Sequence, residues 1–181
     1  MKKTILLFLL TTAPLSAQTM DPATCPMHEE HMKAAKTTPN GDVKHGAAVD
    51  ARHDTLVASH ATTRHSFRLF RDGGAIELRA IDRADQATID NVRAHLKDIA
   101  AQFKKKDFRT PAFVHGREPA GIDGMTRLHN AIQFRYEPVE GGGRIRMTTA
   151  NADALGSIHD FLKFQVVEHH TDNSSVVEED K

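Results

Sequence analysis

The amino-acid sequence predicts an α+β domain in which two ββα units form a four-stranded antiparallel sheet with two helices packed on one face. Two observations carry this prediction. A pair of segments that alternate apolar and polar residues occurs twice, each time around a glycine-rich turn. Each pair precedes a segment whose apolar residues recur three and four positions apart, as in a helix with one buried side. The domain covers residues 64–170, with the first unit at 64–106, an insertion at 107–131 and the second unit at 132–170.

The first unit begins with alternating segments at residues 65–70 and 75–81, which flank a Gly-Gly turn and predict a β-hairpin. The polar residues of Asp82–Asp85 can cap a helix that runs to about Lys105. The expected buried stripe of this helix consists of Ile89, Val92, Leu96, Ile99 and Phe103.

The second unit repeats the pattern with alternating segments at residues 132–137 and 144–149, which flank a turn of three glycines. Asn151 or Asp153 can cap a helix that runs to about Glu168. The expected buried stripe of this helix consists of Leu155, Ile158, Leu162 and Val166.

The insertion between the two units does not share their pattern. Residues 111–115 are predicted to be a short extended segment, and residues 121–131 a short helix with Met125 and Leu128 facing inward. An insertion between two regular units is a reasonable place for functional residues.

The first 17 residues have the order of a secretory signal peptide. Lys2 and Lys3 precede an apolar run over residues 4–10, and the small residues Ser16 and Ala17 offer a cleavage site. The run is too short to span a bilayer, which takes roughly 20 residues, and no later segment of the sequence is long and apolar enough. We therefore expect an exported protein that works in the periplasm, with no transmembrane segment in the mature chain.

Polar segments flank the predicted domain. Residues 18–63 contain prolines, glycines and five histidines but few large apolar residues, which predicts a flexible His-rich arm. Residues 171–181 form a predicted acidic tail. Within the arm, His45, His53 and His60 are irregularly spaced, so we expect them to add weakly to metal binding or not at all.

The composition narrows the classes of function. The formal net charge is zero, so the sequence does not point to a nucleic-acid partner. The chain has 12 histidines but only one cysteine, which excludes a disulfide framework within one chain. It contains no Gly-rich phosphate loop, no His-Glu-x-x-His and no Gly-x-Ser-x-Gly motif. The sequence therefore assigns no catalytic residue and leans against an enzyme.

The densest group of potential metal ligands lies in the arm. Cys25, Met27, His28, His31 and Met32 offer thiolate, thioether and imidazole ligands within eight residues of chain. This ligand set favours copper, with zinc as the alternative. A metal ion can itself supply the free energy that orders such a segment. The other interpretation is a polar arm without a site, since short motifs give many false matches.

The segment Cys25–His28 resembles the short heavy-metal-binding motif near the N-termini of bacterial copper and heavy-metal export proteins. The resemblance implies Cys25, Met27 and His28 as ligands. A proline commonly follows the histidine in that family, whereas this chain has a glutamate. The remainder resembles small exported bacterial proteins of unknown function, on the basis of residues 65–69 and 158–165, and this transfers no catalytic residue.

The histidines of the predicted domain offer a second candidate metal site. His115 at the end of the extended segment can combine with Met125 and His129 into a set that suits copper. His95 and His159 each flank the apolar stripe of a helix, so they can meet if the two helices pack side by side. The alternative for the first set is that Met125 belongs to the core and His129 to the surface. The alternative for His95 and His159 is that both are half-buried and bond to backbone or carboxylate groups.

The outer face of the predicted sheet carries several arginines with Glu77 and Glu137 among them. They can bind an anion or a membrane surface, or they can form cross-strand ion pairs on a solvated face, which the interleaved glutamates favour. The arginines are Arg68, Arg79, Arg135, Arg144 and Arg146.

Three functions follow from these features. The leading hypothesis is a periplasmic metal-binding protein, for copper above all, that acts in metal buffering, resistance or delivery, with a periplasmic protein as a further partner. The second is a non-enzymatic adaptor that uses the arginine-rich sheet face. The third is a metal-dependent enzyme that uses His95, His115 and His159, which requires these side chains to converge.

Overall fold

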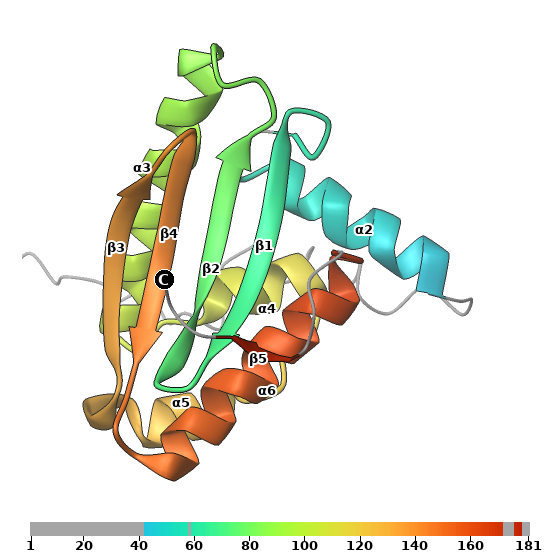
Figure 1. Cartoon of the computed structure of the whole chain (residues 1–181). Coiled ribbons are helices and arrows are strands. Elements are labelled where there is room, and N and C mark those ends of the chain that lie inside the picture. Colours follow the sequence, from blue (N-terminus) through green and yellow to red (C-terminus); the bar gives the residue numbers. More distant parts are fainter. Residues whose placement is uncertain (1–41, 58, 172–175, 179–181) are drawn as a thin grey trace, which may run out of the picture.

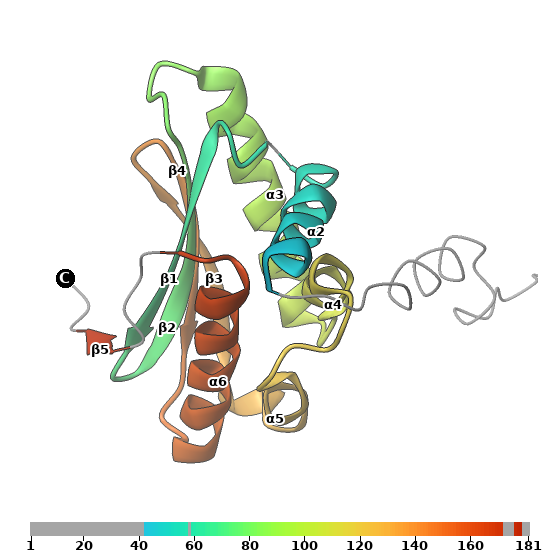
Figure 2. The ribbon, with the colours of Figure 1, turned by 90° about the vertical axis from the view of Figure 1, so that its right-hand side faces the viewer.

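The computed structural model describes residues 42–57, 59–171 and 176–178. Within these residues the chain forms a mixed α+β fold with one sheet of five strands in the order β3-β4-β2-β1-β5. The helices lie together on one face of the sheet, as the edge-on view in Figure 2 shows. In chain order the elements are α2 (Asp42–Asp54), β1 (Thr63–Phe70), β2 (Gly73–Ala80), α3 (Gln86–Lys104), α4 (Arg109–His115), α5 (Ile122–Arg127), a 3-10 turn (His129–Ala131), β3 (Gln133–Val139), β4 (Gly142–Thr148), α6 (Ala152–Glu168) and β5 (Val177–Glu178).

The two hairpins form with the pairing that their alternating sequences favour. Phe67 pairs with Ile76 in the β1–β2 hairpin, and Tyr136 pairs with Ile145 in the β3–β4 hairpin. The hairpins join through antiparallel pairing of β2 with β4, so that the four strands lie side by side in Figure 1. This register turns one set of alternating side chains toward the helices and the other set away from them.

The sheet is wider than the sequence predicts. β5 pairs in parallel with β1, with Leu69 opposite Val177, so the sheet is mixed rather than purely antiparallel and has five strands rather than four. Arg68 on β1 also contacts Glu178 on β5 at 2.5 Å. Val177 and Glu178 of the predicted acidic tail therefore form a strand, which the sequence did not predict. A strand of two residues is too short to produce an alternating pattern.

The two long helices cover the sheet as expected. α3 packs on β2, β3 and β4, whereas α6 packs on β1 and β2. Side chains cap both N-termini: Asp85 accepts a hydrogen bond from the Thr88 backbone N–H, and Asn151 accepts one from the Ala154 backbone N–H. Asn151, rather than Asp153, is thus the cap of the second helix. The buried residues of α3 include its entire expected stripe.

The insertion is helical throughout its ordered elements. Residues 111–115 belong to α4, so the prediction of an extended segment is wrong there. Pro111 occupies the first turn of this helix, where the missing N–H costs no helical hydrogen bond. Gly116 ends the helix in the left-handed conformation, with φ of 64°. The helix expected within residues 121–131 is present as α5, and its Met125 is fully buried.

The second half of the predicted flexible arm is also structured. α2 packs against α4, and its Val49 is fully buried. Two polar contacts join α2 to the domain: Arg52 Nε donates to the Val114 carbonyl at 2.7 Å, and His45 Nε2 lies 2.6 Å from a Glu168 carboxylate oxygen. These partners are distant in sequence, so composition alone gave no sign of them. The predicted signal peptide and residues 18–41 lie outside the described residues.

No helix in the described ranges has the length and apolar character needed to cross a membrane.

Candidate metal centre

Six histidines in the described part of the chain gather at one end of the helical layer, where α2 and the following loop meet the sheet. Their rings contact one another in a continuous chain, with centroid separations from 4.3 Å between His53 and His65 to 6.1 Å between His60 and His169. We call this group the histidine cluster. Its members are His53, His60, His65, His95, His115 and His169.

Each member of the histidine cluster comes from a different element. His53 lies in the last turn of α2, His60 in the loop that follows, and His65 on β1. His65 shares the inward face of β1 with Phe67, which belongs to the core. α3 and α4 contribute His95 and His115, and His169 follows the last residue of α6.

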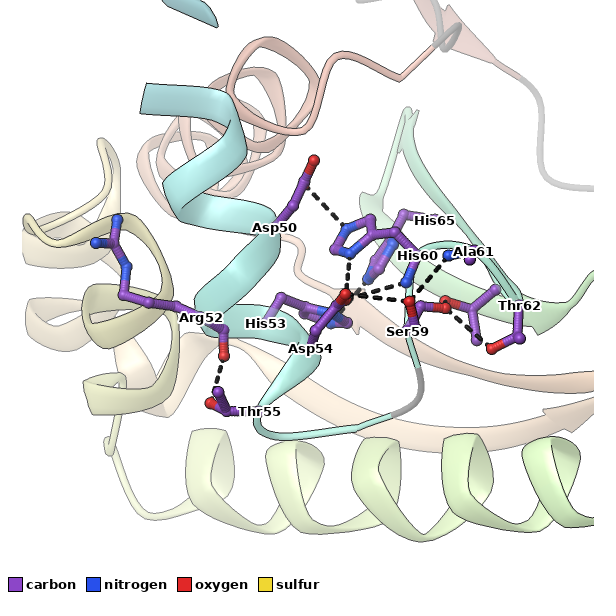
Figure 3. A network of polar contacts seen from close by, with 11 residues as sticks. Asp50, Arg52, His53, Asp54, Thr55, Ser59, His60, Ala61, Thr62 and His65 are labelled. Carbon is purple, nitrogen blue, oxygen red and sulfur yellow. Dashed lines mark hydrogen bonds and ion pairs between the residues drawn. The ribbon is translucent and has the colours of Figure 1, made fainter. Parts of the chain in front are cut away.

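His60 is oriented by a carboxylate from α2. Its Nδ1 lies 2.7 Å from Asp54 Oδ1, and its backbone N–H donates to the same oxygen at 3.0 Å. Ser59 Oγ donates to the other oxygen of Asp54 at 3.1 Å. Figure 3 shows His60 held in this way, with its ring turned back toward α2. When a carboxylate accepts a hydrogen bond from the Nδ1–H group, the lone pair of Nε2 remains available for a metal ion. This is the usual arrangement of a metal-binding histidine.

The free nitrogen of His60 faces a second carboxylate. Nε2 lies 3.2 Å from Asp50 Oδ1, but this contact lacks hydrogen-bond geometry, and Nε2 is buried without a hydrogen-bond partner in the protein. A cation bound here would contact both the imidazole nitrogen and the carboxylate oxygen.

His53 and His65 bring two more nitrogens to the same place. Their Nε2 atoms are 2.9 Å apart. One nitrogen from each of His53, His60 and His65 lies within 4.8 Å of the others. Two nitrogens on one tetrahedral ion, each at about 2.0–2.1 Å, are roughly 3.3 Å apart, so small side-chain movements allow these three to share an ion.

A second set of ligand atoms overlaps the first. Asp50, His60 and His169 also have ligand atoms within 4.8 Å of one another. His60 belongs to both sets, so the two groups of ligand atoms lie next to each other. The buried Nδ1 atoms of His53 and His169 have no hydrogen-bond partner in the protein, which is a costly state for polar atoms.

Burial keeps most of the histidine cluster neutral. It lowers the pKa of His53 to about 3, with repulsion from His60 as the next cause. It lowers the pKa of His169 to about 2, with repulsion from His115 next, and holds the pKa of His65 well below 6.5. Burial also lowers the pKa of His95 and of His115. Neutral imidazoles have the lone pairs that bind metal ions, so these residues need not lose a proton to bind one at pH 7.

The docking of α2 positions His53, and Arg52 is its main polar anchor. Replacing Arg52 with alanine removes a charge-assisted hydrogen bond to Val114, which is worth about 1.5–3 kcal/mol. We expect hydrogen exchange of the α2 amides to accelerate accordingly, with no change in the amides of α3. The exposed Arg127 on α5 provides the control, because its replacement with alanine leaves α2 untouched. Unchanged exchange in α2 of the Arg52 variant would contradict this anchoring role.

The second metal site predicted from the sequence does not assemble as proposed. His129 Nε2 donates to the Phe103 carbonyl at 2.8 Å, and Met125 is part of the hydrophobic core. His115 is buried, and its Nε2 lies 2.8 Å from Gln165 Oε1. Met125 therefore packs in the core, as the alternative interpretation expects, whereas His129 is partly buried and bonds to the backbone rather than lying on the surface.

The proposed meeting of His95 and His159 is also wrong. His159 Nε2 hydrogen-bonds to the carbonyl oxygens of Phe70 and Gly73, at 2.9 and 3.0 Å, in the turn between β1 and β2. His95 instead contacts His53, with 5.9 Å between ring centroids. α4 and α2 lie over the space between α3 and α6 (Figure 2). The convergence required for an enzyme built on His95, His115 and His159 therefore fails at His159.

The arm motif formed by Cys25, Met27, His28, His31 and Met32 lies outside the described residues. Within the described residues, sequence reasoning gave His53 and His60 too little weight and did not group them with His65 or His169. The available signal was local: two aspartates and three histidines occur between positions 50 and 65. It was overlooked because the segment was interpreted as a flexible arm.

Four of the five arginines of the outer sheet face, Arg68, Arg79, Arg144 and Arg146, pair with carboxylates. Arg144 contacts Glu137 and Arg79 contacts Glu77, at 2.6 and 2.7 Å. Arg146 packs over the Phe70 ring at 4.5 Å and also contacts an aspartate in the β1–β2 turn. These pairs give the arginines a structural role.

Comparison of the chain with protein-family models, curated proteins and solved structures finds no match. The fold and the site define a mixed α+β protein with histidine groups that could hold a metal ion.

Proposed function

We propose that this protein binds a transition-metal ion through His53, His60 and His65, with Asp50 or His169 completing the coordination. The observation that carries the proposal is the convergence of one nitrogen from each histidine within 4.8 Å. The Asp54 contact to His60 Nδ1 supports it, because a carboxylate on one ring nitrogen orients the imidazole and leaves Nε2 available as a ligand.

The ligand chemistry favours copper, with zinc second. Imidazole nitrogens suit Cu(II), Zn(II) and Ni(II), and among divalent ions of the first transition row Cu(II) binds such sites most tightly. A carboxylate as fourth ligand is compatible with each of these ions. We therefore expect Cu(II) to bind most tightly and Zn(II) to compete for the same residues.

The proposed biological role is metal buffering, resistance or delivery in the periplasm. It rests on the signal-peptide pattern of residues 1–17 and on the ligand-rich segment at Cys25–Met32. In this proposal the arm captures an ion and the histidine cluster holds it. The imidazoles of His28 and His31 in the arm and those of the cluster both bind Cu(II) or Zn(II), so this transfer needs no change of oxidation state.

The test is calorimetric titration of the mature full-length protein with Cu(II) and Zn(II). We expect replacement of His53 and His65 together by glutamine to weaken binding by more than about 100-fold, because direct ligands matter at least as much as the groups that orient them. Replacement of Asp54 by asparagine is expected to weaken it by roughly 10–100-fold. The exposed His170 gives a matched control, and its replacement by glutamine should leave affinity unchanged.

A second pair of variants separates the histidine cluster from the arm. A protein with Cys25→Ser and His28→Ala keeps the cluster and loses the main ligands of the motif. If this variant alone loses Cu(II) binding, while the His53 and His65 variant retains it, the ion belongs to the arm and the proposed centre is wrong. Copper hyperfine splitting from nitrogen ligands in electron paramagnetic resonance spectra provides a readout that does not depend on affinity.

A further inference from the structure

A pocket of about 60 Å³ lies between the sheet, α3, α4 and α6, directly beside the histidine cluster. Most of its wall is apolar. The sheet contributes Phe67, Ile76, Leu78 and Ile145, and the helices contribute Leu96, Ile99, Phe103, Val114 and Phe161. His53, His65, His95, His115 and His169 line it as well, so the pocket adjoins the proposed metal centre without including His60 or Asp50.

Four described residues in this wall have a buried side-chain nitrogen without a hydrogen-bond partner in the protein: Gln165 at Nε2, and His53, His115 and His169 at Nδ1. Gln165 is 4% exposed, and its Oε1 is engaged by His115 Nε2 at 2.8 Å. With Oε1 in this contact, Gln165 Nε2 is buried without a hydrogen-bond partner. A buried donor of this kind costs free energy unless something accepts its hydrogen. His115 is also buried, with 1% of its surface exposed.

We propose that this pocket binds a small uncharged molecule that has an apolar body and one hydrogen-bond acceptor, and that the acceptor is met by Gln165 Nε2. The apolar wall excludes a charged guest, because no ion pair would repay the loss of its hydration. An apolar cavity of about 150 Å³ is known to hold benzene, so this pocket suits a molecule of about two to four non-hydrogen atoms. Short nitriles, ketones and ethers share this chemistry.

This inference goes beyond the proposed metal binding and does not require it. Gln165 and the apolar wall are present whether or not an ion occupies the histidine cluster. If both proposals hold, the guest lies next to the ion, because His53 and His65 contribute to the pocket and to the metal centre.

The test uses full-length, chelator-treated protein with methyl-labelled isoleucine and valine, followed by nuclear magnetic resonance during titration with acetonitrile. Saturable shifts are expected at Ile76, Ile99 and Val114, with a dissociation constant in the millimolar range or weaker, as the small size of the guest dictates. Xenon serves as a matched probe, because it is apolar and has no acceptor atom.

Two variants decide the outcome. Gln165→Leu keeps the approximate shape of the side chain and removes the amide, so we expect acetonitrile binding to weaken at least 10-fold while xenon still binds. Val114→Phe fills the pocket and should abolish binding of both probes, whereas Val167→Phe on the exposed side of α6 should leave both intact.

The inference is overturned if neither probe produces saturable shifts in the unchanged protein. It is also overturned if acetonitrile binds the Gln165→Leu variant with unchanged affinity, because the amide would then play no part. Loss of metal binding in the calorimetric test would leave these titrations unaffected, so failure of one proposal is distinguishable from failure of the other.

Discussion

Acidification from pH 7.5 to pH 4.5 is expected to destabilise the metal-free protein by several kcal/mol. His53 and His169 have pKa values of about 3 and about 2 in the folded state, because burial opposes their charging. The unfolded chain binds protons at these residues near pH 6.5, so below that pH it holds more protons than the folded chain. Each such histidine then removes about 1.4 kcal/mol of stability per pH unit.

Acid destabilises the folded state because burial lowers the pKa values of these histidines rather than raising them. A lowered pKa favours the folded state above pH 6.5, and that advantage is lost progressively as the pH falls toward the folded-state pKa values. Since natural domains are stable by about 5–15 kcal/mol, two or more such histidines suffice to unfold the protein in mild acid. Urea unfolding at pH 7.5, 6.5, 5.5 and 4.5 in the presence of a chelator measures the effect.

The control is a variant that removes one titrating group. Replacing His169 with glutamine should reduce the loss of stability by about 1.4 kcal/mol per pH unit between pH 6.5 and 4.5. The window excludes the main contribution from Glu168, whose pKa is lowered below 4.5 by hydrogen bonds from His45 and Arg117 despite its burial. A free energy of unfolding that stays constant from pH 7.5 to 4.5 would show that the histidines are not buried in neutral form.

Replacing Phe103 with alanine is expected to lower the free energy of unfolding by about 3–5 kcal/mol. Phe103 is fully buried near the end of α3, and its ring contacts Phe108, Phe134 and Phe161 at centroid distances of 4.8–6.1 Å. The substitution therefore opens a cavity where the first unit, the insertion and the second unit meet. Urea unfolding at pH 7.5 measures the loss.

A matched substitution on the surface shows whether the effect comes from the core. Val167 is 66% exposed on α6, and its replacement with alanine should change stability by less than about 0.5 kcal/mol. If the Phe103 variant were as stable as the Val167 variant, the aromatic group would not be the centre of the core.

The regular elements of the fold were predictable because their signals are local. In the hairpins, alternation places Phe67 and Ile145 on the face that packs against the helices. In α3, the spacing of Val92, Leu96 and Phe103 directs these side chains to one buried side. Such patterns report on one face of one element, which neighbouring residues alone define.

The errors arose where distant residues stabilise a segment. α2 has few apolar residues, so its composition indicated a flexible arm. In the structure it is held by Arg52 on the Val114 carbonyl and by His45 on Glu168, contacts that span 62 and 123 positions. α4 was mistaken for an extended segment, although its Pro111 occupies the first turn, where proline is compatible with a helix.

The sequence by itself determined the two ββα units, the caps of their helices and the abundance of histidine. Only the tertiary structure decided which histidines meet. His53, His65 and His169 come from a docked helix, a strand and the residue after the last helix, and their rings converge because α2 closes over the space between α3 and α6. Side-chain periodicity encodes burial within one element, whereas a site assembled from six elements depends on how those elements pack together.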